Sequence, residues 1–247
     1  SDIAAYMNEA TQTARVIDGL ASGSHLRPIH KVGIIGAGTM GGGIAMNFAT
    51  AGIQVILIET KEEALTRGLG VIQANYQRSA DRGRFPVEEV AERMARIDGA
   101  LDMAALADCD LIIEAVFEDM ELKKSIFKTL DGIAKQGAIL GTNTSGLDID
   151  TIAAQTSRPQ DVIGLHFFSP ANVMKLLEIV RADDTAEDVV ATSMDIAVKI
   201  GKVATLVGVC PGFVGNRILA ARQFQSNELV KRGVLPWDVD AAFNNFG

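Results

Sequence analysis

Lys31 to Glu59 reads KVGIIGAGTMGGGIAMNFATAGIQVILIE, and its pattern of apolar runs and glycines indicates the fold class. An apolar run leads into a glycine-rich turn at 36–41, and a helix-compatible segment over 42–51 follows. A second apolar run over 55–58 then ends on an acid, Glu59. The succession of strand, glycine turn, helix, strand and acid predicts the first unit of a dinucleotide-binding fold.

The glycines of the turn have separate physical tasks in holding a pyrophosphate. The first permits the tight turn, the second lets the backbone approach the ligand, and the third lets the helix pack close to the strand. Unpaired N–H groups at the start of the helix favour phosphate oxygens. A turn that only packs is the competing interpretation. We expect the cofactor-binding residues of this turn to be Gly36, Gly38, Thr39, Met40 and Gly41.

Glu59 stands where an acid accepts hydrogen bonds from both ribose hydroxyls of a bound dinucleotide. Its negative charge would repel a 2′-phosphate. The sequence therefore predicts NAD, rather than NADP, as the cofactor.

Composition excludes several classes of protein. The 247 residues are 48% hydrophobic and carry a net charge of −8, which is not typical of a nucleic-acid binder. No apolar run approaches the about 18 residues of a membrane span, and we see neither a secretion signal nor metal-ligand spacing. Cys109 and Cys210 lie in apolar contexts, and we expect small buried side chains in a reducing compartment.

Strand and helix patterns alternate as far as residue 207, which predicts a parallel sheet with helices on both faces. The fold class is thus α/β, with a doubly wound, mostly parallel sheet of Rossmann type followed by the start of an all-helical domain. Strands are expected at 110–115, 138–141, 162–165, 176–180 and 203–207, and helices at 61–81, 87–94, 102–107, 120–134, 186–200 and 213–232.

Three segments follow from this pattern. Residues 1–30 hold an expected helix, Ile3 to Leu20, and a linker; they are either a frayed end or a tether to something upstream. Residues 31–210 form the NAD-binding domain. Residues 211–247 begin an all-helical region that looks truncated, so we expect the chain to bind NAD with little turnover.

Polar residues follow two of the expected strands, at the edge where open α/β sheets bind ligands. Glu118 comes after the strand at 110–115, and Thr142-Asn143-Thr144-Ser145-Gly146 ends the next one. A plain turn before the following helix is the alternative for the second group. Four arginines near residue 90 suit either a solvated face or contact with the phosphates of a large anionic ligand; they are Arg82, Arg84, Arg93 and Arg96.

His166 and Glu178 are two polar residues in separate apolar strands. Burial of a carboxylate without a partner costs roughly several kcal/mol. We therefore expect both Glu178 and His166 to have a buried polar partner. If the two strands pair, the carboxylate lies beside the imidazole and holds it in one tautomer, which makes a general base. Beside NAD, a base of this kind suits oxidation of an alcohol, with Ser145 and Asn216 as donors to substrate oxygens. A satisfied core histidine is the alternative.

Five motifs together resemble the L-3-hydroxyacyl-CoA dehydrogenase family. They are GAGTMGGGIA, EAVFEDMELKK, TNTSGLDI, GLHFFSPANVMKLLEIV and CPGFVGNR, and the similarity runs in order from about Lys31 to Gly247. The resemblance implies NAD-dependent oxidation of L-3-hydroxyacyl-CoA to 3-oxoacyl-CoA in fatty-acid β-oxidation. His166 would be the base and Glu178 its partner. The remaining implied roles are substrate contact for Ser145 and Asn216, and cofactor contact for Glu118, Lys123 and Asn143.

The amino-acid sequence of the motifs is most similar to that of the dehydrogenase part of multifunctional β-oxidation enzymes. That resemblance implies an enoyl-CoA hydratase module upstream, an acyl-CoA substrate, and a cytoplasmic location, or a peroxisomal one in a eukaryote. Two alternatives stay open: a dehydrogenase of a free hydroxy acid or sugar acid on the same fold, and an NAD-binding subunit without catalysis.

Overall fold

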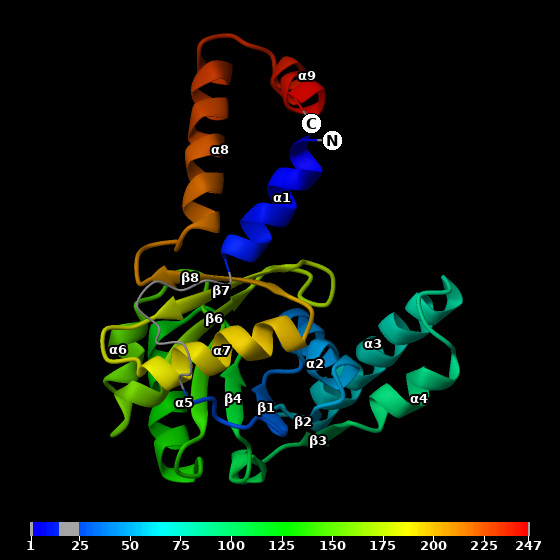
Figure 1. The fold of residues 1–247 in the computed structure, drawn as a ribbon, viewed down its shortest axis with the longest axis vertical. Coiled ribbons are helices and arrows are strands. Elements are labelled where there is room, and N and C mark those ends of the chain that lie inside the picture. Colours follow the sequence, from blue (N-terminus) through cyan, green and yellow to red (C-terminus); the bar gives the residue numbers. More distant parts are fainter. Residues whose placement is uncertain (1, 15–24, 247) are drawn as a thin grey trace.

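A computed structural model describes residues 2–14 and 25–246. One mixed sheet runs through its centre, with helices on both faces (Figure 1). In spatial order its strands are β3 (Ile97–Ala100), β2 (Gln54–Ile58), β1 (Lys31–Ile35), β4 (Leu111–Glu114), β5 (Ile139–Thr142), β6 (Val162–Phe167), β7 (Leu176–Arg181) and β8 (Val203–Gly208).

The predicted doubly wound sheet is confirmed. Strands β1 to β6 are parallel, and the strand order changes direction between β1 and β4, which is the switch point where such sheets bind ligands. Strand β7 pairs with β6 antiparallel, and β8 pairs with β7 in parallel. The sheet is therefore mostly, but not wholly, parallel.

The expected helices from residue 61 onward agree with the structure to within a few residues, although the one expected at 102–107 is a 3-10 helix, and α6 and α9 were not among those expected. The helices are α1 (Asp2–Thr13), α2 (Thr39–Thr50), α3 (Glu62–Asp81), α4 (Glu88–Met94), α5 (Met120–Ile133), α6 (Ile149–Ala153), α7 (Glu187–Lys199), α8 (Gly215–Lys231) and α9 (Pro236–Phe246), with short 3-10 helices η1 (Met103–Leu106) and η2 (Pro159–Asp161). The end of the first expected helix and the linker at 21–24 lie outside the described residues.

Two expectations need correction. Strand β3 was not predicted, because its sequence IDGA has only one large apolar residue and lies at the sheet edge. Helix α8 begins at Gly215 and not at 213, because Phe213 has φ 47°, a left-handed conformation that a helix cannot contain.

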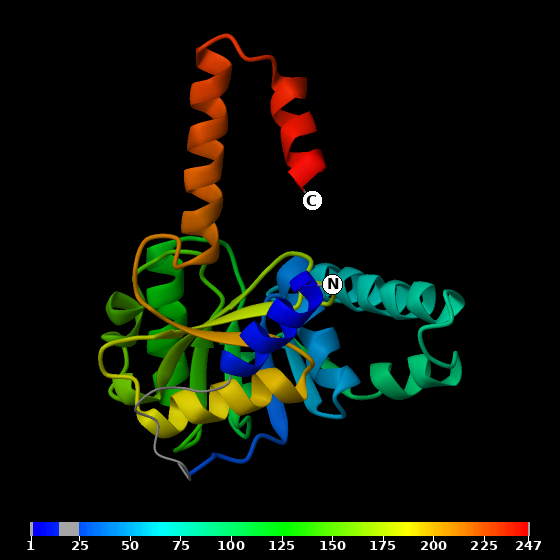
Figure 2. The ribbon, with the colours of Figure 1, turned by 45° about the horizontal axis from the view of Figure 1, so that its top comes forward.

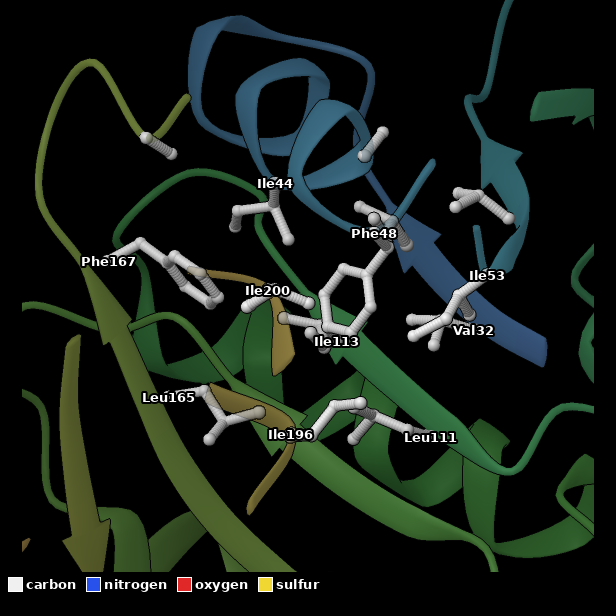
Figure 3. Close-up of a cluster of buried hydrophobic side chains, with 14 of the residues drawn as sticks. Val32, Ile44, Phe48, Ile53, Leu111, Ile113, Leu165, Phe167, Ile196 and Ile200 are labelled. Carbon is white, nitrogen blue, oxygen red and sulfur yellow. The ribbon is translucent and has the colours of Figure 1, made fainter. Parts of the chain in front are cut away.

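Apolar side chains cover both faces of the sheet. On one face Ile44 and Phe48 of α2 and Ile196 of α7 pack onto strand residues such as Ile113 and Leu165 (Figure 3). On the other face, residues of η1, α5 and α6 form a second cluster, which includes Leu106, Phe127 and Ile152. Because both faces of the sheet are packed against helices, the strand ends have defined positions at which side chains can form a site.

Arg27 fixes the segment before β1 to the body. Its guanidinium donates to Asp188 at 2.8 Å through Nε and to Asp161 at 2.7 Å through Nη1, and its side chain is 17% exposed. His25 and His30 beside it are exposed. Sequence reasoning gave Arg27 no role.

Helices α8 and α9 project away from the sheet (Figures 1 and 2). No residue of either helix is buried, and Ile218, Trp237 and Phe246 expose most of their side chains. The guanidinium of Arg222 lies 4.7 Å from the ring centre of Phe243 and joins the two helices. Within the described ranges, no helix has the length and apolar content needed to cross a membrane.

Candidate active site

The glycine turn between β1 and α2 has the geometry that a dinucleotide needs. Gly36 has φ 105°, and a Cβ there would lie 2.8 Å from the carbonyl oxygen of Ala115. A Cβ on Gly41 would lie 1.8 Å from the carbonyl oxygen of Gly36, so only glycine lets α2 start this close to the turn. Gly38, in contrast, has no atom within 4 Å of its would-be Cβ. That open face leaves room for a pyrophosphate against the backbone.

Glu59 lies beside this turn, at the end of β2. Its Oε2 accepts a hydrogen bond from Ala37 N at 3.2 Å, and its Oε1 accepts from Thr60 N at 2.7 Å. Burial raises the pKa of Glu59, but these N–H groups and the charge of Arg67 outweigh burial, so the pKa lies below its usual value. The carboxylate is therefore ionised and suited to accept ribose hydroxyls.

One cavity begins at the turn, and a second lies next to it. The first, of about 270 Å³, is lined by Gly38, Glu59 and Arg67 and reaches Asn172. The second, of about 310 Å³, also includes Asn172 in its lining. Its other lining residues are largely basic or polar, and they include Arg84, Arg93, Lys175, Lys202, Asn47 and Ser79.

The predicted contact between His166 and Glu178 is present. The two residues face each other across β6 and β7, with Nδ1 2.7 Å from Oε2, and their side chains are 6% and 1% exposed. The other oxygen, Oε1, accepts from Val214 N at 3.1 Å and Gly215 N at 2.8 Å. The ring of Phe168 lies against the imidazole, with centroids 4.4 Å apart.

These contacts determine the tautomer of His166. Glu178 receives two backbone N–H groups on Oε1, and a carboxylate, which can only accept hydrogen bonds, is left with Oε2 to accept from the ring. Nδ1 must then carry the proton and donate it to Oε2. Nε2 consequently keeps its lone pair and can accept a proton from a ligand.

A second polar network lies at the ends of β4 and β5. Glu118 Oε1 accepts hydrogen bonds from Thr144 Oγ1 at 2.7 Å, Ser145 N at 2.7 Å and Ser145 Oγ at 2.9 Å. Burial raises the pKa of Glu118, but these hydrogen bonds and the charge of Lys123 together lower it below its usual value. Glu118 is 41% exposed on its side chain, so it can also reach a ligand.

Lys123 is enclosed by carboxylates. Its side chain is 1% exposed, and Nζ lies 2.7 Å from Glu114 Oε1 and 3.5 Å from Glu118 Oε2. Glu114 is fully buried and also accepts from Thr142 Oγ1 at 2.7 Å. Sequence reasoning missed Glu114, although an acid inside the apolar run LIIE was a signal for it.

The two predicted amides lie at the same edge. Asn143 Oδ1 accepts from Phe167 N at 2.9 Å, which joins β5 to the strand that carries His166. Asn216 Nδ2 donates to the carbonyl oxygen of Ser145 at 3.3 Å. Ser145 and Asn216 are therefore neighbours, as a shared substrate contact requires.

The remaining sequence expectations have mixed outcomes. Arg93 stacks on the Phe85 ring at 3.6 Å and pairs with Glu89 at 2.6 Å, so it is partly engaged within the protein. Cys109 is buried, which raises the pKa of its thiol to about 11, whereas Cys210 is only half-buried. No metal-ligating cluster occurs among the residues that the structure describes.

Comparison with known proteins identifies the family. Residues 31–210 match the family described as 3-hydroxyacyl-CoA dehydrogenase, NAD binding domain. The chain belongs to this family. Its cofactor is NAD, as the glycine turn and Glu59 predict.

Relatives of the chain are larger proteins. It is 46% identical over 222 residues to the peroxisomal bifunctional enzyme of Cavia porcellus, covering 90% of this chain and 30% of that protein. It is 40% identical over 221 residues to the glyoxysomal fatty acid beta-oxidation multifunctional protein MFP-a of Brassica napus, again covering 90% of this chain and 30% of that protein. The chain thus spans about a third of the length of the curated relatives it matches.

Solved structures share the fold. A 3-hydroxybutyryl-CoA dehydrogenase from Escherichia coli is 37% identical with a TM-score of 0.82, covering 85% of this chain and 44% of that one. The dehydrogenase part of multifunctional enzyme 1 from C. elegans is 35% identical with a TM-score of 0.76, covering 100% of this chain and 58% of that one.

Proposed function

We propose that this protein oxidises the 3-hydroxyl group of an L-3-hydroxyacyl-CoA to a ketone with NAD, as a step of fatty-acid β-oxidation. The buried pair of His166 and Glu178 carries this proposal. Because β1 and β6 are parallel, the pair lies at the same edge of the sheet as the glycine turn. A base that is placed beside a hydride acceptor is what alcohol oxidation requires.

In this mechanism the chain manages the proton. NAD, when bound, accepts the hydride from the carbon that bears the hydroxyl group. Nε2 of His166 takes the hydroxyl proton, and Glu178 stabilises the imidazolium that forms while it keeps the ring in place. The rings of Phe168 and Phe213 lie 4.4 and 5.6 Å from the imidazole and shield it from water.

The other predicted site residues have places in this proposal. Ser145 and Asn216 lie side by side and orient the substrate oxygens. Glu118 and Asn143 border the nicotinamide half of the cofactor. Lys123 holds Glu118 in position through the ion pair between Nζ and Oε2. Glu118, Asn143 and Ser145 follow the carboxyl ends of β4 and β5, Lys123 lies in the first turns of α5, and Asn216 lies at the start of α8.

The charge of the second cavity supports a CoA substrate. Arg84, Arg93 and Lys175 line it, although the chain as a whole is acidic. A local group of cations in an acidic protein favours a phosphorylated ligand such as the nucleotide of CoA. Since Asn172 lines both cavities, the basic residues lie close to the cavity that begins at the turn.

The domain division is part of the proposal. We infer that residues 31–210 are the NAD-binding domain, that residues 211–247 begin a helical substrate domain, and that residues 1–30 connect to an upstream module with enoyl-CoA hydratase activity. The names of bifunctional and multifunctional relatives support this module. They also support a peroxisomal location in a eukaryote; in a bacterium the location would be cytoplasmic.

Formation of NADH from matched substrates tests the proposed function. The full-length protein should oxidise 3-hydroxybutyryl-CoA and leave free 3-hydroxybutyrate almost unreacted. If free 3-hydroxybutyrate were oxidised with a similar kcat/KM, the substrate class would be a free hydroxy acid and not an acyl-CoA. NADH binding with no oxidation of either compound, or of longer acyl-CoA homologues, would favour an NAD-binding subunit without catalysis.

A further inference from the structure

Lys202 is a buried cation that the proposed mechanism does not use. It immediately precedes β8 and is 6% exposed, which is rare for lysine. Its Nζ donates to the carbonyl oxygens of Ala171 at 2.5 Å and Met174 at 2.7 Å. It also lies 5.9 Å from the ring centre of Phe167, the neighbour of His166 in β6. A buried charge that is bound only to backbone carbonyls calls for a reason.

The carbonyls belong to residues 168–175, which connect β6 to β7 and which we term the wall segment. Asn47 of α2 donates its Nδ2 to the same carbonyl of Ala171 at 3.0 Å. A Cβ on Gly43 of α2 would lie 3.2 Å from Asn172 N, so the wall segment is pressed against this helix. Lys202 and Asn47 thus fasten the wall segment from two sides.

The wall segment separates the two cavities. Its residues Pro170 and Asn172 line the cavity that begins at the glycine turn, and Asn172, Val173 and Lys175 line the basic cavity. The position of the segment therefore sets the shape of both. Because it also follows directly on β6, a shift would reach Phe167 and His166.

The charge of Lys202 has no carboxylate to support it within the described part of the chain. No salt bridge to Lys202 occurs among the described residues. The other charged groups that line its cavity are the cations of Arg84, Arg93 and Lys175, and the titratable phenol of Tyr76 lines it as well. Burial lowers the pKa of Lys202 to about 8. Hydrogen bonds from an ammonium are roughly twice as strong as those from a neutral amine. The attachment should therefore weaken within the range of ordinary assay pH.

We propose that Lys202 is a positioning residue, whose ammonium holds the wall segment against α2 and so fixes the walls of both cavities. Its effect on the CoA substrate rests on the proposed function. Loss of the charge, by mutation or by alkaline pH, loosens the segment and weakens substrate binding more than it slows the chemical step.

Hydrogen exchange tests the attachment without reference to activity. Val173 N and Met174 N donate to Pro170 O at 2.9 and 3.0 Å, so their protection reports the order of the wall segment. In the wild-type protein, protection corrected for intrinsic exchange should fall around pH 8. It should be low at every pH in Lys202→Met and normal in Lys199→Met, an exposed lysine on α7. Equal protection in wild type and Lys202→Met, or a wild-type protection that ignores pH, would overturn the proposal.

Steady-state kinetics of the full-length protein test the positioning. Lys202→Met should raise KM for 3-hydroxybutyryl-CoA by about tenfold, a loss of about 1.4 kcal/mol, with a smaller change in kcat. Wild-type KM should rise above pH 8, and KM of the variant should not. Loosened exchange with unchanged KM would show that Lys202 is only structural. If the wild-type protein oxidised no hydroxyacyl-CoA, the proposed function would fail, while the exchange comparison would still decide whether Lys202 holds the wall segment.

Discussion

Nδ1 of His166 lies 2.7 Å from Oε2 of Glu178, across two antiparallel strands that bury both side chains. Because the carboxylate is occupied on its other oxygen by backbone N–H groups, the imidazole has one orientation and one tautomer available. The first two predictions follow from this arrangement.

His166→Gln removes the group that takes the proton in the proposed mechanism and leaves the glycine turn untouched. In the full-length protein, kcat should fall by about 10² or more, the scale of general-base loss. The dissociation constant of NADH, measured by calorimetry, should change little. An unchanged kcat, under conditions where the chemical step limits the rate, would remove His166 from the mechanism.

Glu178→Gln preserves shape but reverses the tautomer. The amide oxygen would accept from Val214 N and Gly215 N, so the amide NH2 would face Nδ1 and force the ring proton onto Nε2. Because Nε2 could then no longer accept a proton, kcat should fall by about 10² or more with KM nearly constant. Glu121→Gln, which alters an exposed acid on α5, is the control. A raised KM alone would mean that Glu178 binds substrate.

We expect the choice between NAD and NADP to depend on the charge of Glu59. NAD should bind at least about tenfold more tightly than NADP, a difference of about 1.4 kcal/mol. Glu59→Gln should narrow this ratio, because Arg67 in the same cavity would then meet a 2′-phosphate without the opposing carboxylate. Glu63→Gln, an exposed acid of α3, should leave the ratio as it is. Equal affinities in the wild-type protein would contradict the role of Glu59.

Alanine substitutions at different glycines of the turn should affect different properties, namely NADH binding at one position and folding stability at another. Gly38→Ala meets no atom within 4 Å, so the variant should fold normally and bind NADH more weakly. In Gly41→Ala the methyl group would overlap the carbonyl of Gly36, and thermal stability should fall. Gly70→Ala, in an open part of α3, should fold and bind NADH like the wild-type protein. A fully stable Gly41→Ala variant would show that α2 can start farther from the turn.

Arg27 should contribute stability that depends on pH. Its guanidinium lowers the pKa of Asp188 below the ordinary value of 3.8, so this part of the stability is present above that pH and is lost as pH falls through the lower folded value. Arg27→Met should reduce the free energy of unfolding by about 2 kcal/mol at neutral pH, the scale of hydrogen bonds to charged groups, and by less in acid. Urea unfolding of this variant and of Lys231→Met, which breaks an exposed pair, measures the difference. A difference from wild type that is the same at pH 7 and in acid would contradict this linkage.

The sequence allowed the sheet and the contact of His166 with Glu178 to be predicted for physical reasons. A glycine turn between apolar runs has few structural solutions, so it fixed β1, α2 and β2. His166 and Glu178 each needed a buried partner, and the pairing of their strands was the arrangement that satisfied both.

Other features depend on contacts that no local pattern announces. Glu114 contacts Lys123 across the turn between β4 and α5. The acid at the end of LIIE signals that a buried partner is needed, but nothing in its own segment shows which residue that partner is. Lys202 follows a glycine at the end of α7, where a lysine usually faces solvent, and its buried position depends on the path of the wall segment. The backbone donors to Glu178 carry no sequence signal, because any residue supplies an N–H group.

The hydrogen bonds of Glu178 cross the boundary of the family match. That match ends at residue 210, whereas two donors to the carboxylate are Val214 N and Gly215 N. A protein cut at the matched boundary would leave Oε1 buried without them, at a cost on the order of several kcal/mol. The matched NAD-binding segment is therefore smaller than the unit that completes the hydrogen bonds of Glu178. Chimaeras that exchange helical regions between relatives should join their parts after Gly215, so that the Glu178 carboxylate keeps its two backbone N–H donors from the same parent protein.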